Sequence, residues 1–169
     1  MDELKILEGF KNTGRRWKKM FEEYENKKFR TFVIKEVGEA YDTRKITDSS
    51  SAFKIFKEIF DKLDDDKEHF VILYLDSAHN VSYYKIISTG GLDNAAIDVR
   101  SVVRSALLTN CVDIIVAHNH PSRNLEPSCD DLEITEKIDE ALKLFKIKLL
   151  DHLILSKDKY VSMKDEHFI

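Results

Sequence analysis

VDIIVAHNHPSRNLEPSCDD, residues 112–131, is the stretch of this sequence that says most about the fold. Its apolar run, residues 114–117, is typical of a buried strand. His118 and His120 follow at the carboxyl end of that run. Because side chains two apart in an extended chain point to the same side, both imidazoles are expected to face one point in space. Pro121 ends the predicted strand, since it has no amide hydrogen to donate to a neighbouring strand.

A helix is predicted to begin a few residues later. Ser128 has the side chain of an N-cap residue, and Asp131 follows three residues on. A carboxylate at this helix N-terminus can fold back over the two histidines. Two imidazoles and one carboxylate are a typical ligand set for a catalytic zinc ion, with the fourth position left for water.

Each piece of this pattern also has an ordinary structural explanation. A histidine at a strand end can simply be a polar terminus, and Asp131 can be a capping residue that accepts a free helix amide. The pieces together form a compound pattern that is rare by chance. The pattern therefore favours a metal site made of His118, His120 and Asp131.

The spacing His118-x-His120, then Ser128 and Asp131, resembles the JAMM signature of the JAB/MPN metalloprotease superfamily. The wider run, from His118 to Thr135 and again at residues 150–154, is similar to the RadC-like branch, and the likeness covers about residues 45–166. The pattern is neither an HNH nuclease, whose residues are spread over a longer ββα unit, nor a zinc deaminase, which needs Pro-Cys-x-x-Cys. The resemblance implies an α/β fold: a JAB/MPN-like, cytidine-deaminase-like sandwich of a mixed β-sheet with flanking helices.

Hydrophobic periodicity leads to the same fold class. Strands that alternate with helices of this length predict an α/β sandwich about one mixed sheet. We expect a helical segment over residues 1–28 and a metallohydrolase domain over residues 29–169. Within that domain the predicted elements are strands over 29–35, 68–76, 81–88, 147–155 and 160–162, a hairpin turn at 77–80, and helices over 49–63, over 98–109 and from Ser128 to about Phe145.

The resemblance also implies roles for residues outside the ligand set. Glu68, at the head of a predicted strand, matches the glutamate that acts as the base for water in the JAMM pattern. Ser128 would be an N-cap and also a hydrogen-bond donor to an oxyanion. Asp151-His152 matches an Asp-His pair that we interpret as support for the ligands or the core. Arg123 stands where the family usually has glycine. If that glycine takes positive φ, arginine carries a backbone cost there, and it also brings positive charge to this loop.

Composition limits the classes of protein that this chain can be. Its 169 residues suffice for one domain with a proper core, and no apolar run approaches the roughly 20 residues that span a bilayer. The N-terminus lacks a signal-peptide core, so a cytoplasmic protein without membrane contact is expected. Two cysteines, Cys111 and Cys129, are expected to be reduced thiols. Cys129 is better explained as a first-turn helix residue than as a fourth ligand.

Charge is unevenly distributed along the chain. Residues 1–30 carry a net charge of +3 and residues 31–169 carry −7. The basic cluster from Arg15 to Lys19 could contact nucleic acid through phosphates and through stacking on Trp17. A basic amphipathic helix with its tryptophan buried explains the cluster without a ligand, and we favour that interpretation. The acidic remainder argues against an extended nucleic-acid surface.

Three functions compete on this evidence. The favoured one is a zinc-dependent hydrolase that cleaves a peptide or isopeptide bond in a peptide or protein substrate. The alternative is a DNA-repair-associated accessory protein with a structural or vestigial metal site, for which the basic N-terminal cluster is the local support. The third is a non-catalytic MPN scaffold, against which the complete ligand set argues. No sequence feature fixes the oligomeric state.

Overall fold

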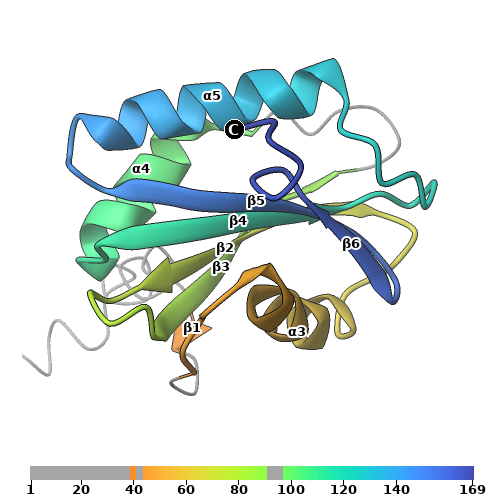
Figure 1. The fold of residues 1–169 in the computed structure, drawn as a ribbon, viewed down its shortest axis with the longest axis horizontal. Helices are drawn as coiled ribbons and strands as arrows, with labels where there is room; N and C mark the ends of the chain where they lie inside the picture. Colours follow the sequence, from red (N-terminus) through yellow and green to blue (C-terminus); the bar gives the residue numbers. More distant parts are fainter. Residues whose placement is uncertain (1–38, 41–43, 91–96) are drawn as a thin grey trace, which may run out of the picture. The chain divides into compact units, whose positions relative to one another are not determined.

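A computed structural model describes residues 39–40, 44–90 and 97–169 (Figure 1). The helices predicted for residues 1–28, the strand predicted for 29–35 and the domain boundary between them lie outside these described residues, so they stay predictions. In the described part of the chain, no helix is both long and apolar enough to cross a bilayer.

A mixed β-sheet forms the centre of the domain. Its strand order is β1-β3-β2-β4-β5-β6, in which β4 and β5 are parallel and all other neighbours are antiparallel. The two-residue β1 was not predicted from the sequence, whereas each of the other strands was. The strands are β1 (Glu39–Ala40), β2 (Glu68–Leu75), β3 (Val81–Gly90), β4 (Asp113–Asn119), β5 (Lys148–Ser156) and β6 (Lys159–Ser162).

Among the described residues, three helices cover the sheet: α3 (Ser49–Phe60) lies on one face, and α4 (Val99–Thr109) and α5 (Cys129–Lys143) lie on the other (Figure 1). Each begins where a side chain accepts a free amide of the first turn. Asp48 accepts from the Ser51 amide before α3, and Asp98 accepts from the Arg100 amide before α4. The predicted helix starts are confirmed at all three positions.

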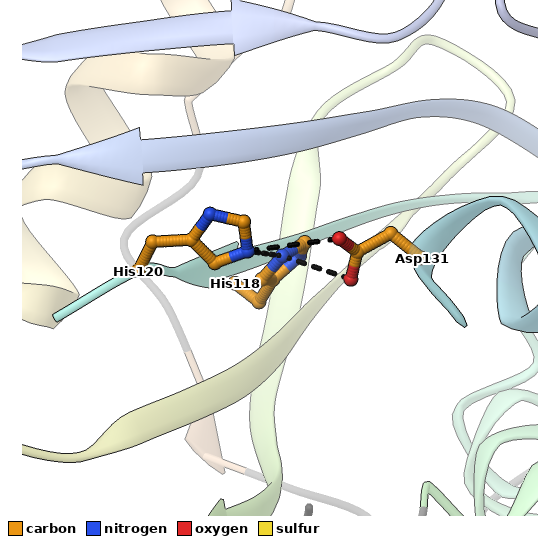
Figure 2. Close-up of side chains that lie close together, drawn as sticks. All are labelled: His118, His120 and Asp131. Atoms are coloured by element: carbon orange, nitrogen blue, oxygen red, sulfur yellow. Dashed lines mark hydrogen bonds and ion pairs between the residues drawn. The ribbon is translucent and has the colours of Figure 1, made fainter. Parts of the chain in front are cut away.

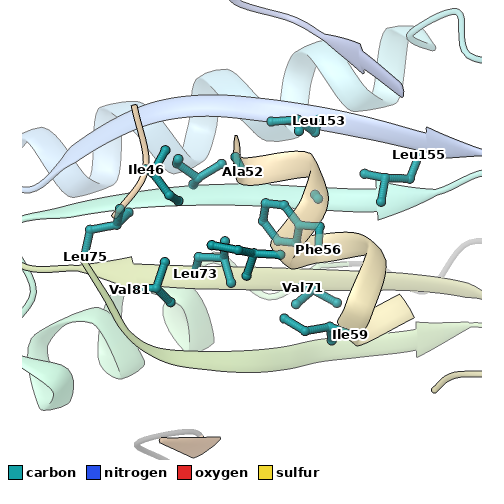
Figure 3. Close-up of a cluster of buried hydrophobic side chains, with 13 residues drawn as sticks. Ile46, Ala52, Phe56, Ile59, Val71, Leu73, Leu75, Val81, Leu153 and Leu155 are labelled. Carbon is teal, nitrogen blue, oxygen red and sulfur yellow. The ribbon is translucent and has the colours of Figure 1, made fainter. Parts of the chain in front are cut away.

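Strand alternation divides the buried side chains between the two faces. In β2 the odd-numbered residues Val71, Leu73 and Leu75 pack with α3, around the fully buried Phe56 (Figure 3). The even-numbered residues of β2 pack with α4 and α5. The α/β fold with a mixed sheet and flanking helices is therefore confirmed. The alternation also decides which polar side chains reach the α5 face.

Phe56 gives a test of this core. Phe56→Ala should lower the free energy of unfolding by about 3–5 kcal/mol, because the ring has no exposed surface and its removal leaves a cavity. Leu144→Ala is the matched control, since Leu144 is 82% exposed and should change stability by less than about 0.5 kcal/mol. Urea unfolding of both variants measures the difference. Equal midpoints for the two variants would contradict this packing.

Candidate metal centre

The three predicted ligands meet where β4 ends and α5 begins. His118 lies on the α5 face of β4 by the same alternation that places Val116 there. His120 follows the last residue of that strand, and Asp131 is in the first turn of α5. The structure thus brings together all three residues that the sequence proposed as ligands (Figure 2).

Their donor atoms converge closely. His118 Nε2 lies 2.8 Å from His120 Nε2 and 3.1 Å from Asp131 Oδ1. His120 Nε2 lies 3.6 Å from Asp131 Oδ2. A tetrahedral zinc ion holds ligand atoms at about 2.0–2.2 Å, which puts neighbouring ligand atoms a little over 3 Å apart. The spacing of the three side chains is close to that.

The proton positions on His120 suit a metal. Its Nδ1 lies 2.6 Å from the main-chain oxygen of Asn124, which can only accept, so Nδ1 carries the hydrogen. In the neutral ring the lone pair is then on Nε2, the atom that faces His118 and Asp131. Electron-rich atoms facing one another at these distances repel unless a proton or a metal ion lies between them. The donor chemistry therefore fits a divalent metal.

Charge at the site points the same way. Burial by itself would raise the pKa of the Asp131 carboxyl, but His118, His120 and the Ser128 hydroxyl outweigh it and hold that pKa well below the usual range. The nearby carboxylate in turn raises the pKa of His120 by stabilising its charged form, against the opposing effect of burial. Asp131 is thus an anion at ordinary pH, as a metal ligand must be.

Glu68 lies at the same end of the sheet. β2 pairs with β4 so that Phe70 is opposite His118, and the same register continued by two residues puts Glu68 opposite His120. Both are on the α5 side by alternation, and Glu68, Ser128 and His120 line one cleft of about 370 Å³. Glu68 itself is exposed. His69 faces the other way, as expected, with its ring edge towards Phe60 of α3.

Asn119 fixes the strand on both sides of Glu68. Its side-chain oxygen accepts the His69 amide at 2.8 Å, and its side-chain nitrogen donates to the Lys67 carbonyl at 2.8 Å. These two bonds extend the pairing of β2 with β4 beyond the last backbone pair. The sequence analysis assigned Asn119 no role, although its place between the two histidines was a signal that it would lie at this strand end.

Ser128 makes the cap that the sequence predicted. Its hydroxyl accepts the Asp131 amide at 3.1 Å and donates to Asp131 Oδ2 at 2.6 Å. The Ser128 amide donates to the same Oδ2 at 2.8 Å. The capping box therefore also orients the carboxylate towards the histidines. Cys129 is exposed and is not part of the converging group.

These residues fall within a match to a known family. The RadC-like JAB domain family matches residues 46–168, which includes every element from α3 to β6. The chain belongs to this family. The JAB/MPN-like fold expected from the resemblance is thereby confirmed for the matched region.

Relatives of this RadC-like JAB domain occur in archaea and bacteria. A UPF0758 protein of Methanosarcina acetivorans is 42% identical over 103 residues, which cover 61% of this chain and 45% of the relative. A UPF0758 protein of Methanococcoides burtonii is 41% identical over the same shares. A UPF0758 protein of Flavobacterium johnsoniae is 39% identical over 123 residues, or 73% of this chain and 53% of the relative. The chain spans about half the length of the curated relatives that it matches.

The loop that follows His120 contains a residue with left-handed backbone geometry. Arg123 has a φ of 62°, the left-handed region in which glycine has no steric cost. Arginine at this position therefore carries a backbone cost that glycine would avoid. Arg123 lines a second cleft of about 280 Å³, which shares His120 and Pro121 with the cleft that contains Glu68. Positive charge therefore lies on one side of His120 and Glu68 on the other.

A larger cavity exists elsewhere in the domain. It measures about 690 Å³ and runs along α5, lined by residues such as Leu132, Glu136 and Phe168. None of the three converging ligand residues lines it. We therefore assign the chemistry to the smaller clefts, where the donor atoms are.

Proposed function

We propose that this RadC-like JAB domain is a zinc-dependent hydrolase of amide bonds, acting on a peptide or isopeptide bond in a peptide or protein substrate. The observation that carries the proposal is the convergence of two imidazole nitrogens and a carboxylate at the edge of a cleft that also contains Glu68. Three protein ligands with an open position are typical of catalytic rather than structural zinc. The JAB family, which often contains hydrolases, supports the same reading.

His118, His120 and Asp131 would hold the zinc ion, which would supply the Lewis acidity for activating water and polarising a carbonyl. Glu68 accepts the proton of the attacking water as the new C–O bond forms. The same carboxyl then delivers that proton to the amine as the C–N bond breaks. The hydroxyl of the water thus ends on the carboxylic acid product and its proton on the amine product, and Glu68 returns to its ionised state.

In this mechanism Ser128 donates a hydrogen bond to the developing oxyanion. Ser128 lines the cleft that contains Glu68, and its hydroxyl donates to Asp131 Oδ2 at 2.6 Å. Because the Ser128 amide also donates to that oxygen, the hydroxyl can turn away without leaving the carboxylate oxygen unpaired. A hydrogen bond formed only in the transition state is the kind that accelerates a reaction.

The charge of the clefts favours this substrate class over nucleic acid. Asp66, Glu68 and Glu126 line the cleft on one side of His120. Phosphate contacts need clustered positive charge, so these carboxylates oppose a DNA strand there. On the other side, the cationic residues Arg123, Lys57 and Lys157 share their cleft with Asp61, Asp64 and Asp65, so that cleft has no excess of positive charge. We therefore do not favour the DNA-accessory alternative for the part of the chain that the structure describes.

The proposal is tested by the dependence of peptide cleavage on metal. Zinc-loaded protein, protein stripped with a chelator, and stripped protein restored with zinc are each incubated with a proteome-derived peptide mixture and with isopeptide-linked peptides. Mass spectrometry should detect new amine termini with the loaded and restored protein and none with the stripped protein. New termini at equal rates in all three samples, or in none of them, would contradict a zinc-dependent amide hydrolase.

A further inference from the structure

A buried chain of hydrogen bonds runs behind His118. His118 Nδ1 lies 2.7 Å from His152 Nε2, and His152 Nδ1 lies 2.6 Å from Thr135 Oγ1. Thr135 Oγ1 lies 2.5 Å from the main-chain oxygen of Asp131. His152 and Thr135 have no exposed surface, and His118 is 1% exposed. This series of hydrogen bonds thus begins and ends on proposed metal ligands, and its inner members are buried away from water.

A β-bulge brings His152 into this chain. β5 pairs with β4 so that Leu149 is opposite Ile114 and Asp151 is opposite Ile115, which leaves Leu150 as an extra residue. The extra residue reverses the alternation beyond it, so that His152, opposite Val116, faces α5. A regular strand would have directed His152 to the α3 face, away from His118.

The donor and the acceptor of each hydrogen bond in this series can be assigned. The main-chain oxygen of Asp131 can only accept, so the single hydrogen of the Thr135 hydroxyl is donated to it. Thr135 Oγ1 must then accept from His152 Nδ1. The sulfur of Met163, 3.8 Å from the hydroxyl, is too weak an acceptor to reverse this order.

The same assignment extends from His152 to His118. His152 has no exposed surface, and its two ring nitrogens contact a hydroxyl and a second imidazole rather than a carboxylate, so a charged ring would be desolvated without compensation. The ring is therefore neutral and carries one hydrogen, on Nδ1. His152 Nε2 therefore accepts, and His118 Nδ1 must donate to it. In a neutral His118 ring the lone pair is left on Nε2, which points at His120 and Asp131.

We propose that Thr135 and His152 are positioning residues that hold His118 in the tautomer with hydrogen on Nδ1, and so reserve its Nε2 for the metal. The inference rests on the metal site of the proposed function. His120 is held in the same tautomer directly by the main-chain oxygen of Asn124. The two histidines thus carry their hydrogen on the same ring atom for different reasons. Because His118 is held by side chains and His120 by a main-chain oxygen, only the tautomer of His118 can be changed by substituting the residue that holds it.

The test compares Thr135→Val with Thr135→Ser. Valine has the shape of threonine without the hydroxyl, so His152 loses the acceptor that fixes its own tautomer, whereas serine keeps that acceptor. Zinc affinity, measured with a competing chelator, should fall about 10- to 100-fold in Thr135→Val, as when a partner behind a metal ligand is lost, and less than about threefold in Thr135→Ser. Unchanged affinity in Thr135→Val would overturn the proposal.

Nuclear magnetic resonance of ¹⁵N-labelled histidines separates tautomer control from loosened packing. In metal-free protein, well above the ordinary imidazole pKa of about 6.5, His118 should carry its hydrogen on Nδ1 in the parent and in Thr135→Ser. Thr135→Val should show hydrogen on Nε2 in a substantial fraction of molecules. A weakened zinc site with an unchanged His118 tautomer would overturn the proposal, because the hydroxyl would then act through packing alone.

A second variant guards against misfolding of Thr135→Val. His152→Gln can accept from His118 and donate to Thr135, whereas His152→Leu can do neither. Zinc affinity should be recovered at least tenfold by glutamine relative to leucine, and equal affinities would count against the chain. If the parent protein binds no zinc, the proposed function fails, yet the tautomer is still read from the metal-free spectra, so the two failures are distinguishable.

Discussion

His118→Ala should abolish tight zinc binding. The parent protein should bind about one equivalent, whereas the variant should bind on the order of a thousandfold more weakly, because one of three protein ligands to an ion bound by roughly 10–16 kcal/mol is lost. His120→Ala and Asp131→Ala should show the same loss, since all three donor atoms lie within 4.8 Å of one another. Equilibrium dialysis with metal analysis measures the stoichiometry, and competition with a chelator measures the affinity.

A matched control for these variants is His167→Ala. The chemical change is the same, but His167 is exposed near the C-terminus and is not part of the converging group. Its zinc stoichiometry should equal that of the parent protein. If His118→Ala and His120→Ala also keep one equivalent of tightly bound zinc, the metal centre is elsewhere and the proposed mechanism fails with it.

The ligand set could be predicted from the sequence because it depends on local geometry. The two-residue period of a strand puts His118 and His120 on one side, and the three-residue spacing of a capping box ties Asp131 to Ser128 at a helix start. Both rules involve residues that are close in the sequence, so they can be applied without knowing the tertiary structure. The meeting of the two elements was expected because a carboxylate at this helix start can fold back over the histidines, and the family resemblance implied the same ligand set.

The supporting contacts could not be predicted in the same way. His152 reaches His118 because of an extra residue at Leu150, and a regular alternation would have placed its ring on the opposite face. Asn119 bonds to the backbone on both sides of Glu68, about fifty residues away in the sequence. Such contacts depend on the register between strands, which is set by the packing of the whole sheet rather than by a local pattern.

Glu68→Gln should keep zinc and lose hydrolysis. Glu68 is not among the converging donor atoms, so the variant should bind one equivalent of zinc with the affinity of the parent protein. Glutamine keeps the size of the side chain and lacks a carboxylate that can take a proton, so turnover should fall about 10²- to 10⁴-fold. Zinc content and the rate of peptide cleavage are measured on the same preparations.

The expected loss depends on where the backbone holds Glu68. The register of β2 with β4 and the two bonds from Asn119 keep its main chain opposite His120. Glu126→Gln is the matched control, because it removes a carboxylate from the same cleft without that placement, and it should retain most of the activity. Equal losses in the two variants would mean that the negative charge of the cleft matters rather than a base at Glu68. A Glu68→Gln protein that lost its zinc would instead make Glu68 a ligand, and near-normal turnover would remove it from the mechanism.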